Sequence, residues 1–325
     1  MNSEIISNVL QTLVKKYKLL QKTLVKTEDV TLIEYKIRPL KKVLQLVQNK
    51  SNLQDIQNIP GIGKGTIDRI KEIQKTGTLK ELGEIDKEIL YNKVVNKVAL
   101  SLQQIIGIGP VNSLEFVKVH HVVSVREFID KVNKGTIKVN DKIKLGIKYY
   151  GLLCTQIPRE NIVKIKDHVI IPALKRVRVN CIPMAEICGS FRRKKSHSSD
   201  IDVLITCTEN SILGMFISEL VRIGFIVDGL TDTNVQTKYM GFCRYERKVY
   251  RIDIRFVKPE SWATSLAYFT GSYQHNILMR GIAINKGLKL NEYGLFRSTG
   301  ERIEVKSEKD LYRILEKPFV KPEYR

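Results

Sequence analysis

The sequence is poor in acidic residues and lacks the apolar segments that mark a membrane protein. Among its 325 residues, 34 are Asp or Glu and 55 are Lys or Arg, which gives a formal net charge of +21. No apolar run is long enough to span a bilayer, and residues 1–18 have the pattern of an amphipathic helix in place of a signal peptide. Such an excess of positive charge favours a polyanionic partner, with nucleic acid ahead of an anionic membrane.

Cysteine and histidine are scarce as well. The five cysteines are odd in number and widely spaced, and none belongs to a Cys-x-x-Cys pair: Cys154, Cys181, Cys188, Cys207 and Cys243. This usage predicts reduced, mostly buried thiols in an intracellular protein. Because His120 and His121 are adjacent, they cannot share a helical face, and we expect no zinc site.

Two kinds of periodicity divide the chain. Apolar residues recur at helical spacing within 5–20, 32–47 and 67–73, whereas short β-branched runs dominate from residue 182, at 201–206, 225–228 and 248–257. A single helical pattern, 211–222, lies between these runs. The pattern predicts a multidomain α and α+β protein, in which helical domains precede a domain with a mixed or antiparallel sheet.

The segment 189–206, GSFRRKKSHSSDIDVLIT, carries the clearest chemistry. On a strand, Asp200 and Asp202 would point to the same side while Ile201 faces the core. Two such carboxylates repel each other unless a cation lies between them, and oxygen ligands favour Mg²⁺ shared with substrate phosphates. The Ser-rich turn before them offers amides and hydroxyls to phosphate oxygens. We therefore predict a nucleotidyl-transfer site.

A second segment, RIDIR, supplies a third carboxylate. Its alternation places Arg251, Asp253 and Arg255 on one face. The simpler interpretation is an edge strand whose charges neutralise one another. The functional interpretation is a site for two metal ions about 3.5–4 Å apart, in which Asp200 and Asp202 bridge both ions and Asp253 binds the catalytic ion.

The helical half contains an internal repeat. IPGIG at 59–63 is echoed by IGIGP at 106–110, and each is followed by a helical pattern. This is the helix-hairpin-helix pattern, which grips a DNA backbone without reading its sequence, so we expect Gly61, Gly63, Gly107 and Gly109 to contact DNA. Carbonyls of such hairpins hold a monovalent cation, Na⁺ or K⁺. The expected ligands are Ile59 and Ile62 in the first hairpin, and Gln103, Ile105 and Ile108 in the second.

The order of these motifs resembles that of DNA polymerase β and the X family of DNA polymerases, from about residue 30 to the C-terminus. The resemblance implies dNTP contacts from Arg159, Gly189, Ser190, Arg193, Ser198, Tyr268, Phe269, Gly271 and Asn276. It implies DNA contacts from Thr237, Lys238, Arg255 and Arg280 in addition to the hairpin glycines. Glu292 and Tyr293 match residues that close onto the palm.

The resemblance also implies an organisation in four parts. A lyase-like helical domain with the first hairpin spans 1–85, and a DNA-binding subdomain with the second hairpin spans 86–155. The catalytic palm spans 156–258, and the subdomain that binds the nascent base pair spans 259–325. The length leaves no room for a proofreading exonuclease, so the chain resembles a minimal member of the group.

The implied function is template-directed, gap-filling DNA synthesis with two Mg²⁺ ions in base excision repair. The implied partners are gapped or nicked double-stranded DNA, dNTPs and a DNA ligase, with no membrane association, and we expect a monomer. The location would be the nucleus for a cellular protein, or the host cytoplasm or virion for a cytoplasmic DNA virus.

One departure affects the lyase chemistry of the group, in which a lysine forms a Schiff base. Arg69 stands at the position of that lysine, and a guanidinium that stays protonated cannot form the imine. Gly65 replaces a phosphate-binding lysine. If a nucleophile exists it must be another lysine, with Lys36, Lys64, Lys71 and Lys80 as candidates, so we expect weak or absent lyase activity. Two further departures are Ser199, in place of a glycine, and Tyr273, in place of an acid over the incoming base.

Three alternatives stay open at this point. Poly(A) and CCA-adding enzymes share the Gly-Ser and Asp-x-Asp pattern but not the paired hairpins. An untemplated terminal transferase needs a long loop before RIDIR, where 243–250 leaves only a short turn. A non-catalytic DNA-end scaffold would not need three intact aspartates.

Overall fold

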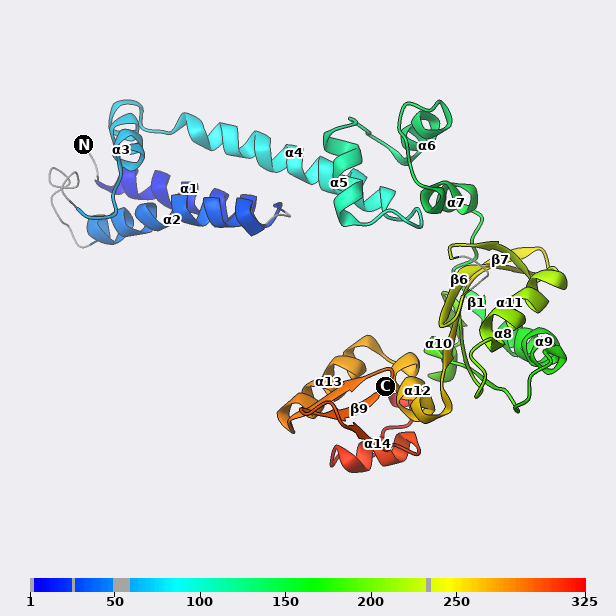
Figure 1. The fold of residues 1–325 in the computed structure, drawn as a ribbon. Coiled ribbons are helices and arrows are strands. Elements are labelled where there is room, and N and C mark those ends of the chain that lie inside the picture. Colours follow the sequence, from blue (N-terminus) through cyan, green and yellow to red (C-terminus); the bar gives the residue numbers. More distant parts are fainter. Residues whose placement is uncertain (1–2, 25–26, 49–58, 232–234) are drawn as a thin grey trace. The chain divides into compact units, whose positions relative to one another are not determined.

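The computed structural model describes residues 3–24, 27–48, 59–231 and 235–325. It separates into two compact units, Met1–Ile147 and Lys148–Arg325, each of which is described by itself (Figure 1). The predicted order of a helical part followed by a part with a mixed sheet is confirmed. Within the described ranges, no helix is both long and apolar enough to cross a membrane. The finer boundaries near residues 85, 155 and 258 remain predictions.

The N-terminal unit is helical. Its elements are α1 (Ser3–Gln21), α2 (Thr27–Gln48), α3 (Lys64–Thr76), α4 (Lys80–Leu102), α5 (Pro110–Lys118), α6 (Val125–Asn133) and α7 (Asp141–Tyr149), whose last residues belong to the second unit. Apolar side chains three and four residues apart on α1, α2 and α3 meet in one core that includes Leu10, Leu13, Ile37, Leu40 and Ile73. This core holds the first hairpin and the start of α4 together.

The C-terminal unit is built on a five-stranded sheet in the order β2-β4-β7-β6-β5. The strands are β2 (Met184–Ile187), β4 (Ile201–Thr206), β5 (Ile226–Gly229), β6 (Lys238–Tyr245) and β7 (Lys248–Val257). Only β4 and β7 pair in parallel, and the other pairs are antiparallel. Two short strands, β1 (Ile157–Pro158) and β3 (His197–Ser198), pair separately.

Helices cover both faces of this sheet (Figure 1). On one face, α8 (Arg159–Ile165), the π-helical turn Lys166–Ile170, α9 (Ile171–Arg176) and α11 (Ile212–Arg222) pack on buried strand residues such as Ile205, Ile252 and Ile254. Because strand side chains alternate, Arg251, Asp253 and Arg255 must face the other side. On that side lie α10 (Gly189–Arg192) and α12 (Trp262–Thr270), with Trp262 and Leu266 of α12 against Leu204 and Val257.

The last part of the unit has its own small core. It contains Pro259–Ser261, α13 (Tyr273–Asn285), the three-stranded sheet of β8 (Leu288–Asn291), β9 (Gly294–Arg297) and β10 (Arg302–Ile303), α14 (Glu308–Ile314) and the turn Pro322–Tyr324. Met279, Leu295, Leu311 and Tyr312 fill the core. The buried carboxylate of Glu308 accepts hydrogen bonds from Arg192 of α10 and from Arg325, and the bond from Arg192 ties this part to α10.

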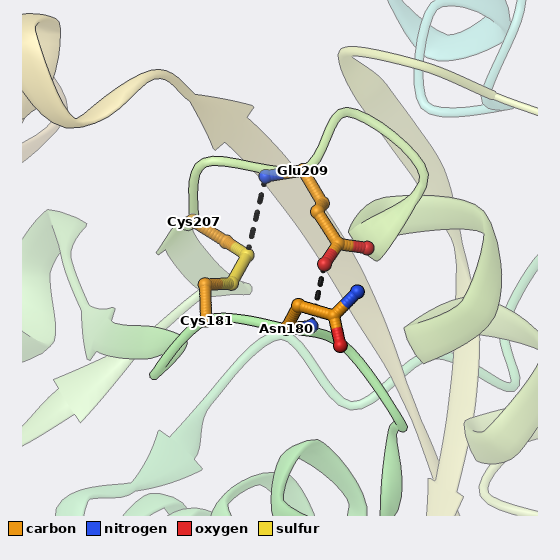
Figure 2. The surroundings of a disulfide bond; sticks show 4 residues. All are labelled: Asn180, Cys181, Cys207 and Glu209. Atoms are coloured by element: carbon orange, nitrogen blue, oxygen red, sulfur yellow. Dashed lines mark hydrogen bonds between the residues drawn. A yellow bond between two sulfur atoms is a disulfide. The ribbon is translucent and has the colours of Figure 1, made fainter.

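One sequence prediction is wrong: two of the cysteines are not free. Figure 2 shows a disulfide bond between Cys181 and Cys207, whose Cα atoms are 6.2 Å apart. The antiparallel pairing of β2 with β4 explains the contact, because it sets Met184 opposite Thr206 and so brings the start of β2 to the end of β4. Spacing along the chain does not reveal this pairing. Cys154, Cys188 and Cys243 are free thiols, and burial raises the pKa of the latter two.

We predict that reduction of this disulfide lowers the free energy of unfolding by about 3.5 kcal/mol, the loop-entropy value for a 26-residue separation. Denaturant unfolding with and without dithiothreitol measures the change. Cys154→Ser, which removes a free thiol, is the control: on reduction, its free energy of unfolding should fall by the same amount as that of the wild-type protein. Alkylation in denaturant without prior reduction should label three cysteines. Labelling of all five would contradict the bond.

Candidate active site

The three predicted aspartates lie together on neighbouring strands. Asp202 of β4 is directly opposite Asp253 of β7 in the parallel register, and Asp200 immediately precedes β4. The neighbouring Ile201 and Val203 are fully buried, which turns the carboxylates of Asp200 and Asp202 to the α10 side of the sheet. Neighbouring strands are about 4.8 Å apart, so Asp202 and Asp253 share one small region.

The charges of these groups oppose one another. Burial, together with the negative charges of Asp200 and Asp253, raises the pKa of Asp202 to about 7, although Arg193 and Arg255 act in the other direction. Burial also raises the pKa of Asp253, while Arg251 opposes the shift through an ion pair of 2.6 Å. Three crowded carboxylates of this kind are the environment that a bound cation relieves.

The three aspartates have the chemistry that a divalent cation needs. As the side chains stand, no three Asp, Glu, His or Cys groups in the described ranges converge closely enough to hold a metal, and Asp253 is paired with Arg251 instead. All three aspartates nevertheless offer oxygen, the donor that hard divalent ions prefer, and their mutual repulsion favours a cation between them. They are the residues that would hold it.

A glycine sets the position of Asp202. Gly189 begins α10 with a φ of +55°, a conformation that side chains rarely adopt, and a Cβ there would lie 2.2 Å from Asp202 Oδ2. The carboxylate therefore packs directly on the backbone of the turn. Next to it, Ser190 Oγ donates a 2.8 Å hydrogen bond to Ser198 Oγ.

Arg159 and Arg193 border the same turn. Pairing of β1 with β3 sets Ser198 opposite Ile157, and the Arg159 amide donates to the carbonyl of Ser196 at 2.9 Å. The Arg159 guanidinium lies 4.1 Å from the centroid of the Phe191 ring. Arg193 donates to the carbonyl of Thr270 at 2.6 Å. The structure thus collects two hydroxyls and two guanidinium groups beside the aspartates, and this is the donor set that a triphosphate needs.

The predicted base-facing residues meet at the junction of α12 and α13. The Asn276 side chain donates to the Tyr268 carbonyl at 2.8 Å, and the Arg280 guanidinium lies 4.9 Å from the centroid of the Tyr268 ring. Arg280 also pairs with Glu292 at 3.5 Å. The intervening turn contains Gly271, with a φ of +69° and a cis peptide bond to Ser272.

Basic groups predicted to contact DNA lie at one end of the β6–β7 pair. Lys238 of β6 is opposite Arg255 of β7, and the Thr237 carbonyl accepts a 2.9 Å bond from the amide of Phe256. The Arg255 guanidinium lies 5.4 Å from the centroid of the Phe269 ring. The Tyr293 carbonyl accepts a hydrogen bond from the Ser261 hydroxyl.

The two repeats form equivalent turns. Gly61 and Gly107 have φ of +84° and +98°, and the amides of Ile62 and Ile108 donate to the carbonyls of Ile59 and Ile105 at 3.2 and 3.1 Å. Gly63 and Gly109 precede α3 and α5 without a capping side chain, so the first amides of α3 and the amides that follow Pro110 in α5 are left for an external acceptor.

The hairpins differ in the surroundings of their carbonyls. In the first, the Lys42 ammonium already donates to the carbonyl of Pro60, beside the expected cation ligands Ile59 and Ile62. In the second, Gln103 closes α4 and its side chain donates to Ser113 at 3.0 Å. The cation ligands expected at both turns remain predictions, and at the first turn Lys42 already supplies a positive charge.

Arg69, which stands at the position of the lyase lysine, belongs to a closed polar cluster. Arg69 donates twice to Glu81, once at 2.8 Å, and Tyr17 donates to the same carboxylate. The hydrogen bond with Glu81 raises the pKa of Arg69 further. Among the candidate lysines, Lys36 lies 5.8 Å from the centroid of the Tyr17 ring, and Lys80 is an exposed partner of Glu84. Sequence reasoning missed Tyr17 and Glu81 because their contact with Arg69 depends on how α1, α3 and α4 pack.

Comparison with known proteins identifies the family in which this arrangement occurs. Residues 156–259 match the family model described as DNA polymerase beta palm, and residues 265–325 match DNA polymerase beta thumb. The chain belongs to the X family of DNA polymerases.

The relatives agree with this assignment. The chain is 27% identical to DNA polymerase lambda of Rattus norvegicus, over 85% of this chain and 49% of that protein. It is also 27% identical to DNA polymerase lambda of Arabidopsis thaliana, over 84% of this chain and 54% of that protein. The chain therefore spans about half the length of these curated relatives. Its fold is similar to polymerase beta of Leishmania infantum in a ternary gap complex, with a TM-score of 0.66, 25% identity, and coverage of 74% and 95%.

We predict that Gly189→Ala reduces primer extension by roughly 10²-fold or more, because the added Cβ collides with Asp202 and displaces it. The control is Gly224→Ala, whose φ is +73° but whose Cβ would meet nothing within 4 Å. Both variants carry about 1–2 kcal/mol of backbone strain. Equal extension by the two variants would show that the contact with Asp202 is unimportant.

Proposed function

We propose that this chain is a template-directed DNA polymerase that fills gaps by transferring dNMP from a dNTP to a primer 3′-hydroxyl. The observation that carries the proposal is the pairing of Asp202 with Asp253 beside a turn that presents Ser190, Ser198, Arg159 and Arg193. Carboxylates for divalent ions and donors for a triphosphate are adjacent, as nucleotidyl transfer requires.

Different side chains of this protein have different roles in the proposed reaction. Arg159, Arg193 and the two serine hydroxyls bind the β- and γ-phosphates and leave the α-phosphorus facing the aspartates. Asp200, Asp202 and Asp253 would hold two Mg²⁺ ions, which neutralise the phosphates and acidify the attacking hydroxyl when bound. In this proposal Asp253 faces the primer 3′-hydroxyl, and its carboxylate is held in place by an ion pair with Arg251. Catalysis then depends on orientation and charge neutralisation.

DNA recognition in this proposal does not read sequence. The two hairpins offer backbone amides to phosphates, and a monovalent cation would add to the second one. Lys238 and Arg255 provide further positive charge near the primer and template backbones. Asn276 and Arg280 face the nascent base pair. A Leishmania infantum relative solved as a ternary gap complex supports gapped DNA as the substrate.

Untemplated synthesis receives no support from the fold. Tyr245 pairs with Lys248, so only Glu246 and Arg247 connect β6 to β7. That turn has no room for the long loop that a terminal transferase requires. The role in base excision repair, the ligase partner, the monomeric state and the intracellular location are parts of the same proposal.

The direct test is primer extension with Mg²⁺ on a one-nucleotide gap, comparing the four dNTPs, rNTPs and a single-stranded primer without template. We expect addition of the complementary dNMP on the gap and none on the bare primer. Efficient untemplated addition would favour a terminal transferase, and no addition under any condition would favour a DNA-end scaffold.

We predict that Asp253→Asn lowers the rate of addition by roughly 10³-fold, because it removes a charge that divalent ions and the attacking hydroxyl need. Binding of dNTP and gapped DNA should change little, since Asp200 and Asp202 remain. Single-turnover extension and fluorescence titration measure the two quantities. Asp141→Asn is the control, because Asp141 is an exposed acid on α7. Near-normal extension by Asp253→Asn would overturn the site.

We predict weak or absent lyase activity beside efficient polymerisation, since Arg69 is locked by Glu81 and cannot form an imine. Borohydride trapping of the protein on DNA with a 5′-deoxyribose phosphate measures the lyase activity. Lys36→Ala is the informative variant, because Lys36 is the candidate placed over Tyr17. Efficient trapping that maps to a single lysine would contradict the prediction and identify the nucleophile.

A further inference from the structure

A groove with a volume of about 780 Å³ lies on the face of the five-stranded sheet that is turned away from the aspartates. Its lining residues on α11 recur at spacings of three and four and so share one helical face: Ser211, Gly214, Met215, Ser218, Glu219 and Arg222. The opposite face of α11, with Phe216 and Leu220, is buried in the sheet core. This outer groove therefore runs along the whole of α11, roughly 16 Å for its 11 residues.

The other wall of the outer groove adds positive charge. It contains Arg176, Val177 and Arg178, at and just after the end of α9, which packs against α11 (Figure 1). Three guanidinium groups, those of Arg176, Arg178 and Arg222, and one carboxylate, that of Glu219, thus line the groove. Two positive charges are left uncompensated, so the outer groove suits an anionic ligand.

The three arginines keep N–H donors for such a ligand. Arg222 donates to Glu219 at 2.6 and 2.8 Å, and Arg176 donates to the same carboxylate at 3.5 Å. The Arg178 side chain is exposed and has no hydrogen-bond or ion-pair partner among the residues that the structure describes. Because a guanidinium carries five N–H donors, all three groups can donate to an anion while the pairs with Glu219 stay intact.

The outer groove adjoins a second groove at the end of the sheet, where the basic strand residues lie. Asn210 and Gln236 line both grooves, and the second one, with a volume of about 420 Å³, is also lined by Thr237 and Lys258. Thr237 directly precedes Lys238 of β6, the residue opposite Arg255 of β7. A DNA strand that contacts Thr237 therefore lies at the entrance of a path that leads to the three arginines.

We propose that the outer groove binds the phosphate backbone of one strand of the gapped DNA, beyond Thr237, through Arg176, Arg178 and Arg222. The inference rests on the proposed function. The planar guanidinium groups match phosphate oxygens in pairs. None of the described residues that line the groove is aromatic, so it offers bases nothing to stack on, and its contacts do not read sequence. At 3.4 Å per nucleotide, the groove holds about five nucleotides of one strand.

Fluorescence anisotropy with labelled gapped DNA tests this proposal through the salt dependence of binding. Each arginine that contacts a phosphate adds about one to the slope of log K against log salt, so Arg178→Ala should lower the slope by about one and Arg178→Ala/Arg222→Ala by about two. The loss should be the same for every base sequence. It should disappear when one of the two duplex arms, shortened in turn, has lost about five nucleotides, the length that the groove holds.

Arg313→Ala is the matched control. Arg313 is exposed and donates to Asp310 three residues earlier on α14, as Arg222 donates to Glu219 on α11, but it lines neither groove. This variant should keep the wild-type slope. The maximal rate of nucleotide addition at saturating DNA should be unchanged in all variants, because the arginines lie on the face of the sheet away from the aspartates, and this rate also shows that the variants are folded.

Two outcomes would overturn the groove proposal while the polymerase proposal stands. The arginine variants could bind long-armed gapped DNA with the wild-type salt slope, which would leave the outer groove outside the DNA path. Their loss could be equally large on DNA with both arms shortened, which would assign the effect to the active-site region. Absence of nucleotide addition by the wild-type protein, in contrast, would overturn the polymerase proposal itself.

Discussion

The structure depends on the parallel register of β4 and β7. This register sets Asp202 opposite Asp253 and so concentrates like charges that repel each other. The opposite faces of the two strands hold the alignment, because Ile201, Val203, Ile252 and Ile254 are fully buried in the sheet core. A slip of one residue would turn these side chains to the α10 side and the carboxylates into the core. Hydrophobic burial thus stabilises an arrangement that electrostatics opposes.

A second set of contacts holds the α10 turn to the last part of the C-terminal unit. The Glu308 carboxylate is bound by Arg192 at 2.6 Å and by the buried guanidinium of Arg325 at 2.6 Å. Burial acts to raise the pKa of Glu308, but the bond from Arg192 and the charge of Arg325 outweigh it and the pKa is lowered. Loss of one partner from such a buried network costs about 3–5 kcal/mol. Because Arg192 adjoins Arg193, the network also orients the α10 turn toward α12.

Local patterns in the sequence predict many of the strands, helices and turns. The expected strands 201–206 and 248–257 are β4 and β7, and the expected helix 211–222 is α11 to within one residue. The hairpin turns follow from glycines that must adopt positive φ, at Gly61 and Gly107. The pairing of Asp253 with Arg251 follows from strand alternation. These features depend on residues close together in the chain.

Features that depend on distant contacts were not predictable. The Cys181–Cys207 bond requires the pairing of β2 with β4, and the Tyr17–Glu81–Arg69 cluster requires three packed helices. The Glu308 network joins residues more than 100 positions apart. The contact between Gly189 and Asp202 was also hidden, since it depends on how α10 sits over β4. In each case the residue types are ordinary and only the fold brings them together.

In the proposed reaction, the β4–β7 register brings the three aspartates together to hold two divalent ions. Anomalous diffraction from crystals grown with gapped DNA, a non-hydrolysable dNTP and Mn²⁺ tests it directly. We expect two manganese peaks about 3.5–4 Å apart, both touching Asp200 and Asp202 and one touching Asp253. Manganese bound elsewhere, or no peak between Asp202 and Asp253 with the nucleotide in place, would contradict it.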